Sequence, residues 1–153
     1  MTLSIRSALD RICVVEAALT ITDPETLAIA RCYKYLPPRD GVIEANSFMH
    51  SYALVDVTHS INGTRKQLYV VRSQFWCGNP DKDRAADIST AFLEKWVDAF
   101  SNDLTLNGAA SMLKFAGSTP ATLVDLDYGN LHSIGLELAL QVTLGPEAVT
   151  VGP

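Results

Sequence analysis

The sequence predicts an α+β fold, in which an antiparallel β-sheet carries two main helices on one face. Residues 132–143 alternate without a break, as a strand with one apolar face does. The apolar residues on that face are Ile134, Leu136, Leu138, Leu140 and Val142. Asn62-Gly63 separates two further strand-like runs, as in a tight hairpin. Two segments with helical periodicity lie before and after this hairpin, so strands and helices are grouped rather than alternating.

The first predicted element is a helix over residues 2–19, with Thr2 or Ser4 as its N-cap. Its apolar residues recur at three- and four-residue spacing and are Ile5, Ala8, Leu9, Ile12, Val15 and Leu19. Residues 22–24 (Thr-Asp-Pro) end the helix, and a strand is expected over 27–35. Residues 37–41 (Pro-Pro-Arg-Asp-Gly) then open a loop that reaches to about Asn46.

The hairpin is predicted from Tyr52–His59 and Arg65–Cys77, joined through Asn62-Gly63. Both faces of the second strand carry apolar residues, which favours a central place in the sheet. A second helix is predicted over Pro80–Phe100, with Asn79 as N-cap. We expect its stripe to pack on the sheet, and this stripe consists of Ile88, Phe92, Trp96 and Phe100.

A short apolar piece is predicted over 109–115, followed by a strand over 122–127 and a turn at 128–130 that leads into the final strand. The length of 153 residues suits one domain. Residues 1–145 are expected to form it, and residues 146–153, which are rich in Val, Gly and Pro, to form a flexible C-terminal tail.

The composition disfavours several functions. The net charge is −5 and there is no cluster of Lys and Arg, so specific nucleic-acid binding is not expected. The N-terminal segment carries charges among its apolar residues and reads as neither a signal peptide nor a membrane span. The three cysteines, Cys13, Cys32 and Cys77, are few and widely spaced, which predicts neither a disulfide framework nor a zinc site. Buried, reduced thiols are expected, consistent with a reducing cytoplasm at the time of folding.

Catalytic motifs are weak in this sequence. His50, His59 and His132 do not lie at metal-ligand spacing from one another, from a cysteine or from a carboxylate. Asp125 and Asp127 share one face of a strand, so a small enzyme or ligand-binding domain that uses them is an alternative, although solvated charge beside a turn is favoured. We therefore expect a non-enzymatic protein with no catalytic residue, cofactor or metal.

The order of elements carries a family resemblance over nearly the whole chain. The features are the N-terminal helix, the segment 32–38 (Cys-Tyr-Lys-Tyr-Leu-Pro-Pro), the hairpin over 52–77, the helix that opens at Pro80-Asp81, and the closing segments 126–130 and 134–142. With these features the chain resembles the tail terminator (tail completion) proteins of long-tailed bacteriophages and related minor tail proteins of the neck region.

The resemblance implies a viral structural protein of the virion tail or neck, assembled in the cytoplasm of the host bacterium. Its partners would be copies of itself in a homohexameric ring, the tail tube protein, and the head–neck connector protein, without a membrane. The alternative within this class is another neck or head-closure adaptor. From the residues themselves, we expect the loop over 37–50 to pack on a neighbouring subunit or on the tube through Val42, Ile43, Phe48 and Met49.

Overall fold

The computed structural model of the chain describes residues 3–37, 43–129 and 131–148. Six strands form the main sheet in the order β3-β4-β5-β8-β6, and β7 also pairs with β8. The strands are β3 Arg31–Tyr33, β4 Ser47–His59, β5 Thr64–Trp76, β6 Met112–Phe115, β7 Ala121–Tyr128 and β8 Leu131–Ala148. Every pairing in this sheet is antiparallel except β3 with β4. A separate pair consists of β1 Thr20–Ile21 and β2 Leu27–Ala28.

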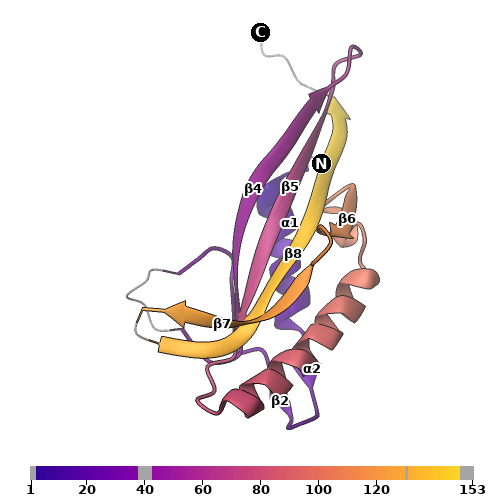
Figure 1. Cartoon of the computed structure of the whole chain (residues 1–153). Helices are drawn as coiled ribbons and strands as arrows, with labels where there is room; N and C mark the ends of the chain where they lie inside the picture. Colours follow the sequence, from indigo (N-terminus) through magenta and orange to yellow (C-terminus); the bar gives the residue numbers. More distant parts are fainter. Residues whose placement is uncertain (1–2, 38–42, 130, 149–153) are drawn as a thin grey trace.

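The predicted α+β class is confirmed, with helices α1 Ile5–Ala17 and α2 Lys82–Ser101 and a short 3-10 turn η1 Leu106–Gly108. Figure 1 shows α1 behind β5 and β8, with α2 beside the lower part of the sheet. A shared contact supports this arrangement, because Ser73 of β5 and Trp96 of α2 both donate hydrogen bonds to Glu16 of α1. The helices therefore form one layer of a two-layer fold, and the sheet forms the other.

The helix ends follow capping chemistry. Ser4 caps α1 by accepting a hydrogen bond from the Ser7 backbone N–H at 3.1 Å, so this predicted cap is confirmed. The predicted cap of α2 is wrong by two residues. Asp81 rather than Asn79 caps it, while the Asn79 side chain accepts a hydrogen bond from the Asp81 N–H. The predicted apolar stripe of α2 is confirmed, because Ile88, Phe92, Trp96 and Phe100 are at most 1% exposed.

The predicted hairpin is confirmed, with β4 and β5 joined through Gly63 at a φ of 81°. Strand β4 begins at Ser47, however, rather than at Tyr52, so the predicted loop ends earlier. As a result Phe48 and Met49 are strand residues, and they are buried together with Ile43 by the chain itself. The predicted subunit contact rests on apolar groups in a surface loop. That premise is wrong for Ile43, Phe48 and Met49, because all three are buried within the subunit. Val42 lies outside the described residues.

Three further boundaries differ from prediction. The strand expected over 27–35 is divided into β2 and β3, which belong to different sheets. The apolar piece over 109–115 contains only the short strand β6. Strand β8 continues through Ala148, opposite Thr64, so the first residues assigned to a flexible tail belong to the sheet.

Gly135 of β8 lies at a close approach to β5 and to the side chain of Leu126 in β7. A Cβ atom at this position would lie 2.1 Å from the Phe75 carbonyl oxygen and 2.7 Å from Leu126 Cδ1. Only glycine leaves room for β8 to pack there between β5 and β7.

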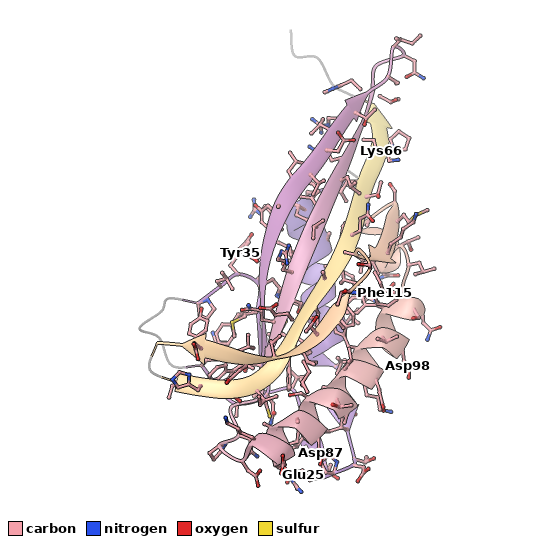
Figure 2. The ribbon with its side chains drawn as sticks, viewed as in Figure 1. Glu25, Tyr35, Lys66, Asp87, Asp98 and Phe115 are labelled. Atoms are coloured by element: carbon pink, nitrogen blue, oxygen red, sulfur yellow. The ribbon has the colours of Figure 1, made fainter. Side chains whose placement is uncertain are left out.

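The molecule divides into a body and an arm. We define the arm as the β4–β5 hairpin over residues 52–68, and the body as the remainder of the described chain. The hairpin tip extends past both helices, and the end of β8 runs beside it (Figure 1). Figure 2 shows side chains projecting from both sides of this extension, with Lys66 among them, whereas Asp87 and Asp98 lie on α2 in the body.

Candidate functional site

The first candidate site is the surface of the arm. Every residue from Tyr52 to His59 is exposed. Because neighbouring side chains of a strand point to opposite faces, neither face of this part of β4 is covered. The large apolar residues exposed on the arm are Tyr52, Leu54, Val55, Val57 and Ile61, and Ile61 at the turn is fully exposed. The arm therefore presents apolar surface that the fold of one subunit leaves in solvent.

The outer edge of β4 adds a second feature to this surface. Strand β3 pairs with β4 only at Ser47–Met49. Beyond Met49, no strand in the described part of the chain pairs with that edge. An open edge presents backbone N–H and C=O groups that another strand can pair with. A bulge between Leu54 and Asp56 interrupts the ladder halfway along the arm.

The second candidate site is a polar cluster inside the body, centred on Glu16 of α1. The Glu16 side chain is fully buried and accepts hydrogen bonds from Trp96 Nε1 at 2.9 Å and from Ser73 Oγ at 2.7 Å. Its Oε1 atom also contacts Nε2 of the fully buried His50. Several hydrogen-bond donors surround this one carboxylate, so the polar atoms of the buried Glu16 side chain are satisfied.

His50 is held at both ring nitrogens. Its Nδ1 atom lies 2.7 Å from the Tyr33 carbonyl oxygen, and its Nε2 atom contacts Glu16. Both partners are acceptors, which favours a ring protonated at both nitrogens. Burial opposes a charged ring, but the Glu16 carboxylate and Cys13 together outweigh it and raise the pKa of His50 to about 10. The pair is therefore an internal salt bridge.

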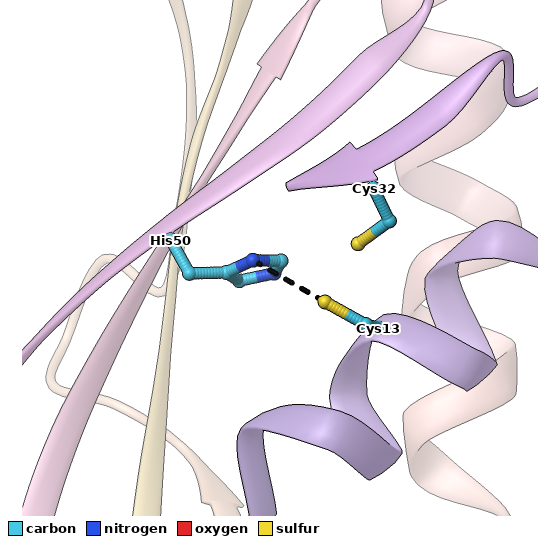
Figure 3. A group of neighbouring side chains, drawn as sticks. All are labelled: Cys13, Cys32 and His50. Carbon is cyan, nitrogen blue, oxygen red and sulfur yellow. Dashed lines mark hydrogen bonds between the residues drawn. The ribbon is translucent and has the colours of Figure 1, made fainter. Parts of the chain in front are cut away.

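Two thiols adjoin this salt bridge. Cys13 Sγ of α1 lies 3.8 Å from His50 Nδ1, and Cys32 Sγ of β3 lies 3.7 Å from Glu16 Oε1. Ligand atoms of Cys13, Cys32 and His50 all lie within 4.8 Å of one another (Figure 3). Both cysteines are partly exposed, whereas His50 is buried. These residue types are ligands of thiophilic metals and also the types found in thiol chemistry.

The two thiols are not equivalent. A hydrogen bond from Cys32 and the neighbouring His50 ring, acting against burial, lower the pKa of Cys13 to about 6. The hydrogen bond to Cys13, together with burial, raises the pKa of Cys32. The first proton therefore leaves the pair easily, because the resulting thiolate lies beside an imidazolium ring and a thiol donor.

The spacing of these residues hid the cluster in the sequence. Cys13, Glu16, Cys32 and His50 come from three separate elements, and the parallel pairing of β3 with β4 brings Cys32 opposite Phe48, close to His50. One signal was present, because Glu16 lies four residues after Ile12 on the apolar stripe of the first helix. A carboxylate at a core position requires partners there.

The predicted carboxylate pair is placed differently. Asp125 and Asp127 are both exposed on β7, where Asp127 faces His132 of β8 and the two side chains are in contact. His59 is exposed at the outer end of β4. Cys77 is buried within the main apolar core. The structure thus joins Asp127 to one histidine, but at an exposed hairpin rather than in a covered cavity.

Comparison of the sequence with models of protein families and with curated proteins finds no match to either. Within the described residues, neither helix has the length and apolar character needed to cross a membrane.

Proposed function

We propose that this chain is a non-enzymatic structural subunit that assembles with copies of itself through the arm. The observation that carries the proposal is the exposure of both faces of β4 from Tyr52 to His59, beside a strand edge with which no strand of the described residues pairs. A strand with apolar residues and an open edge is a natural association site. A second chain that covers it would gain both backbone hydrogen bonds and apolar burial.

We further propose that the assembly is a tail terminator ring, which caps the tail tube of a long-tailed bacteriophage and joins it to the head–neck connector. The family resemblance of the sequence supports this reading, and the hexameric symmetry rests on the resemblance alone. A closed ring of more than two subunits needs a heterologous interface, in which one surface binds a different surface of its neighbour. An arm that projects from the body suits such an interface.

Another neck or head-closure adaptor is the runner-up, because a projecting arm serves any ring of the neck. A small enzyme that uses Asp125 and Asp127 is less favoured. Both carboxylates are exposed, and Asp127 lines a shallow groove with Leu36 and Gln74. Such an open site excludes little water, and exclusion of water is what perturbs the pKa of a catalytic carboxylate.

A matched pair of substitutions tests the proposal. Val57 on the arm and Val97 on α2 are each 38% exposed. Val57→Lys should prevent the protein from forming rings on isolated tail tubes, because it places a charge in the proposed contact, while Val97→Lys should leave ring formation intact. Electron microscopy of tube ends and sedimentation of the free protein measure both.

Two outcomes would contradict the proposal. One is ring formation by Val57→Lys at the level of the parent protein, which would remove the arm from the interface. The other is a lone subunit, or none, at the tube end in micrographs of the virion neck. Localisation of the protein to the connector layer instead would favour the adaptor reading.

A further inference from the structure

We propose that Cys13, Cys32 and His50 form a binding site for a thiophilic metal ion, with zinc as its metal. The ligands come from α1, β3 and β4, and their ligand atoms lie within 4.8 Å of one another. This inference is independent of the proposed role in assembly, because it concerns residues of the body rather than of the arm.

The spacing of the ligand atoms is close to that of a tetrahedral zinc site. Zn–S bonds of about 2.3 Å and Zn–N bonds of about 2.0 Å place neighbouring ligand atoms roughly 3.5 to 3.8 Å apart. Cys13 Sγ and His50 Nδ1 are 3.8 Å apart. Cys32 Sγ lies within 4.8 Å of the other ligand atoms, so a small side-chain movement would bring it to bonding distance of a shared metal ion.

The surroundings of His50 match those of a metal-bound histidine. A ligand histidine usually donates its other ring N–H to a carboxylate or carbonyl, which fixes the orientation of the ring. Here Nδ1 faces the Cys13 thiol, and Nε2 contacts the Glu16 carboxylate. Trp96 and Ser73 in turn fix that carboxylate with hydrogen bonds. The structure therefore holds the His50 ring in place, with Nδ1 facing both the Tyr33 carbonyl oxygen at 2.7 Å and the Cys13 sulfur at 3.8 Å.

Charge and proton balance are consistent with zinc. Two thiolates neutralise the divalent ion, and the neutral ring supplies Nδ1 while its Nε2 proton stays between His50 and Glu16. Binding therefore releases the Cys32 thiol proton and the Nδ1 proton, because Cys13 already loses its proton easily, and the hydrogen bond from Nδ1 to the Tyr33 carbonyl oxygen is given up. Two sulfur ligands and one imidazole select zinc over harder cations, and a water molecule completes four ligands.

The position of the site gives the metal a structural role. Pairing of β3 with β4 ends at Tyr33 and Met49, and His50 follows directly. A metal bound here would join α1, β3 and β4 at the base of the arm. Since such a site does not exist in the unfolded chain, binding would stabilise the fold.

The test uses the full-length reduced protein and zinc or cobalt(II) alone as the probe. We expect one equivalent of zinc per chain, and cobalt should give sulfur-to-cobalt charge-transfer absorption. At a hundredfold excess of zinc over its Kd, Tm should rise by at least about 5 °C. Cys13→Ser and Cys32→Ser should each weaken zinc binding at least tenfold. Cys77→Ser is the matched control and should bind zinc like the parent, because Cys77 lies outside the cluster.

Three results would overturn the inference. The first is reduced, folded parent protein that binds no zinc and shows no charge-transfer band with cobalt. The second is binding that Cys13→Ser and Cys32→Ser leave unchanged, which would place the metal elsewhere. The third is a Cys13–Cys32 disulfide, seen as a mass lower by two hydrogens, that forms readily in air even in the presence of zinc. The titration of the parent protein decides the matter even if a variant fails to fold.

Discussion

The two ends of β4 lie in contrasting environments, although they belong to one continuous strand. Ser47, Phe48, Met49 and His50 are at most 1% exposed, because helices and neighbouring strands cover them. From Tyr52 onward every residue of the strand is exposed. Strand β5 follows the same course, with buried residues concentrated in its second half.

The contrast separates apolar residues that packing within the subunit explains from apolar residues that it does not explain. In the body, packing within the subunit explains the apolar residues. For example, the ring of Phe75 contacts the rings of both Phe48 and Phe92. In the arm, Val55 is 57% exposed and Ile61 is fully exposed, so packing within the subunit explains little of their apolar character. Their exposure supports the proposed contact of the arm with another chain.

Removing the central carboxylate of the body should have the largest effect on stability. Glu16→Ala deprives His50, Ser73 and Trp96 of their common acceptor and leaves a buried charge unpaired. The expected loss is at least about 3–5 kcal/mol in the free energy of unfolding, measured by urea denaturation. Glu94→Ala on the exposed face of α2 is the control and should change little; equal losses would mean that the cluster is not central.

Trp96→Ala should cost about 3–5 kcal/mol, toward the lower end of that range, because it removes a fully buried ring that packs on Phe100 and Phe115. Trp96→Phe keeps most of the packing and removes only the donor to Glu16, so it should cost about 1–3 kcal/mol. Thermal and urea melts of the two variants separate packing from hydrogen bonding. A melt within a degree or two of the parent for Trp96→Ala would mean that the orientation of α2 is wrong.

Gly135→Ala should destabilise the body by about 1–3 kcal/mol, because a methyl group would meet the Phe75 carbonyl oxygen and Leu126. Glu137→Ala, two residues along the same strand and exposed, serves as control. If Gly135→Ala unfolds at the same urea concentration as the parent, then β8 does not approach β5 as closely as described.

The smallest effect on stability is expected in the arm. Ile61→Ser changes a fully exposed residue at the hairpin turn, so the free energy of unfolding should change by less than about 0.5 kcal/mol. The same variant should nevertheless weaken self-association, as sedimentation at several concentrations would show. A large loss of stability with unchanged association would mean that Ile61 contributes to the fold of the subunit and not to association.

Local patterns in the sequence predicted the fold well. Period-two alternation located β8, the Asn-Gly turn located the hairpin, and four-residue spacing located the buried face of α2. The start of β4 was missed, because the apolar residues at 48 and 49 adjoin a loop and lack clear alternation. Met49 is buried with Trp76 and Tyr33, and Phe48 is buried in the main core against Phe75, so the burial of both depends on residues distant in sequence.

The candidate sites were harder to predict. Exposure of the arm depends on how much of the hairpin the helices cover, and local periodicity in the sequence does not predict this. The cluster of Cys13, Cys32 and His50 depends on the parallel pairing of β3 with β4, and such long-range pairing leaves no spacing signature. Glu16 on an apolar stripe was the one local anomaly that pointed to it.

The central place of β8 has a consequence for the order of folding. The hairpin closes between His59 and Arg65, residues near each other in sequence, whereas β5 meets β8 through distant pairs such as Phe75 with Leu136. Local contacts form sooner than distant ones, because closing a long loop costs more entropy. We therefore expect the hairpin to form early and the body to be completed only when β8 is inserted. Until that moment one edge of β5 is open to wrong partners, so slow insertion of β8 would expose the folding chain to aggregation.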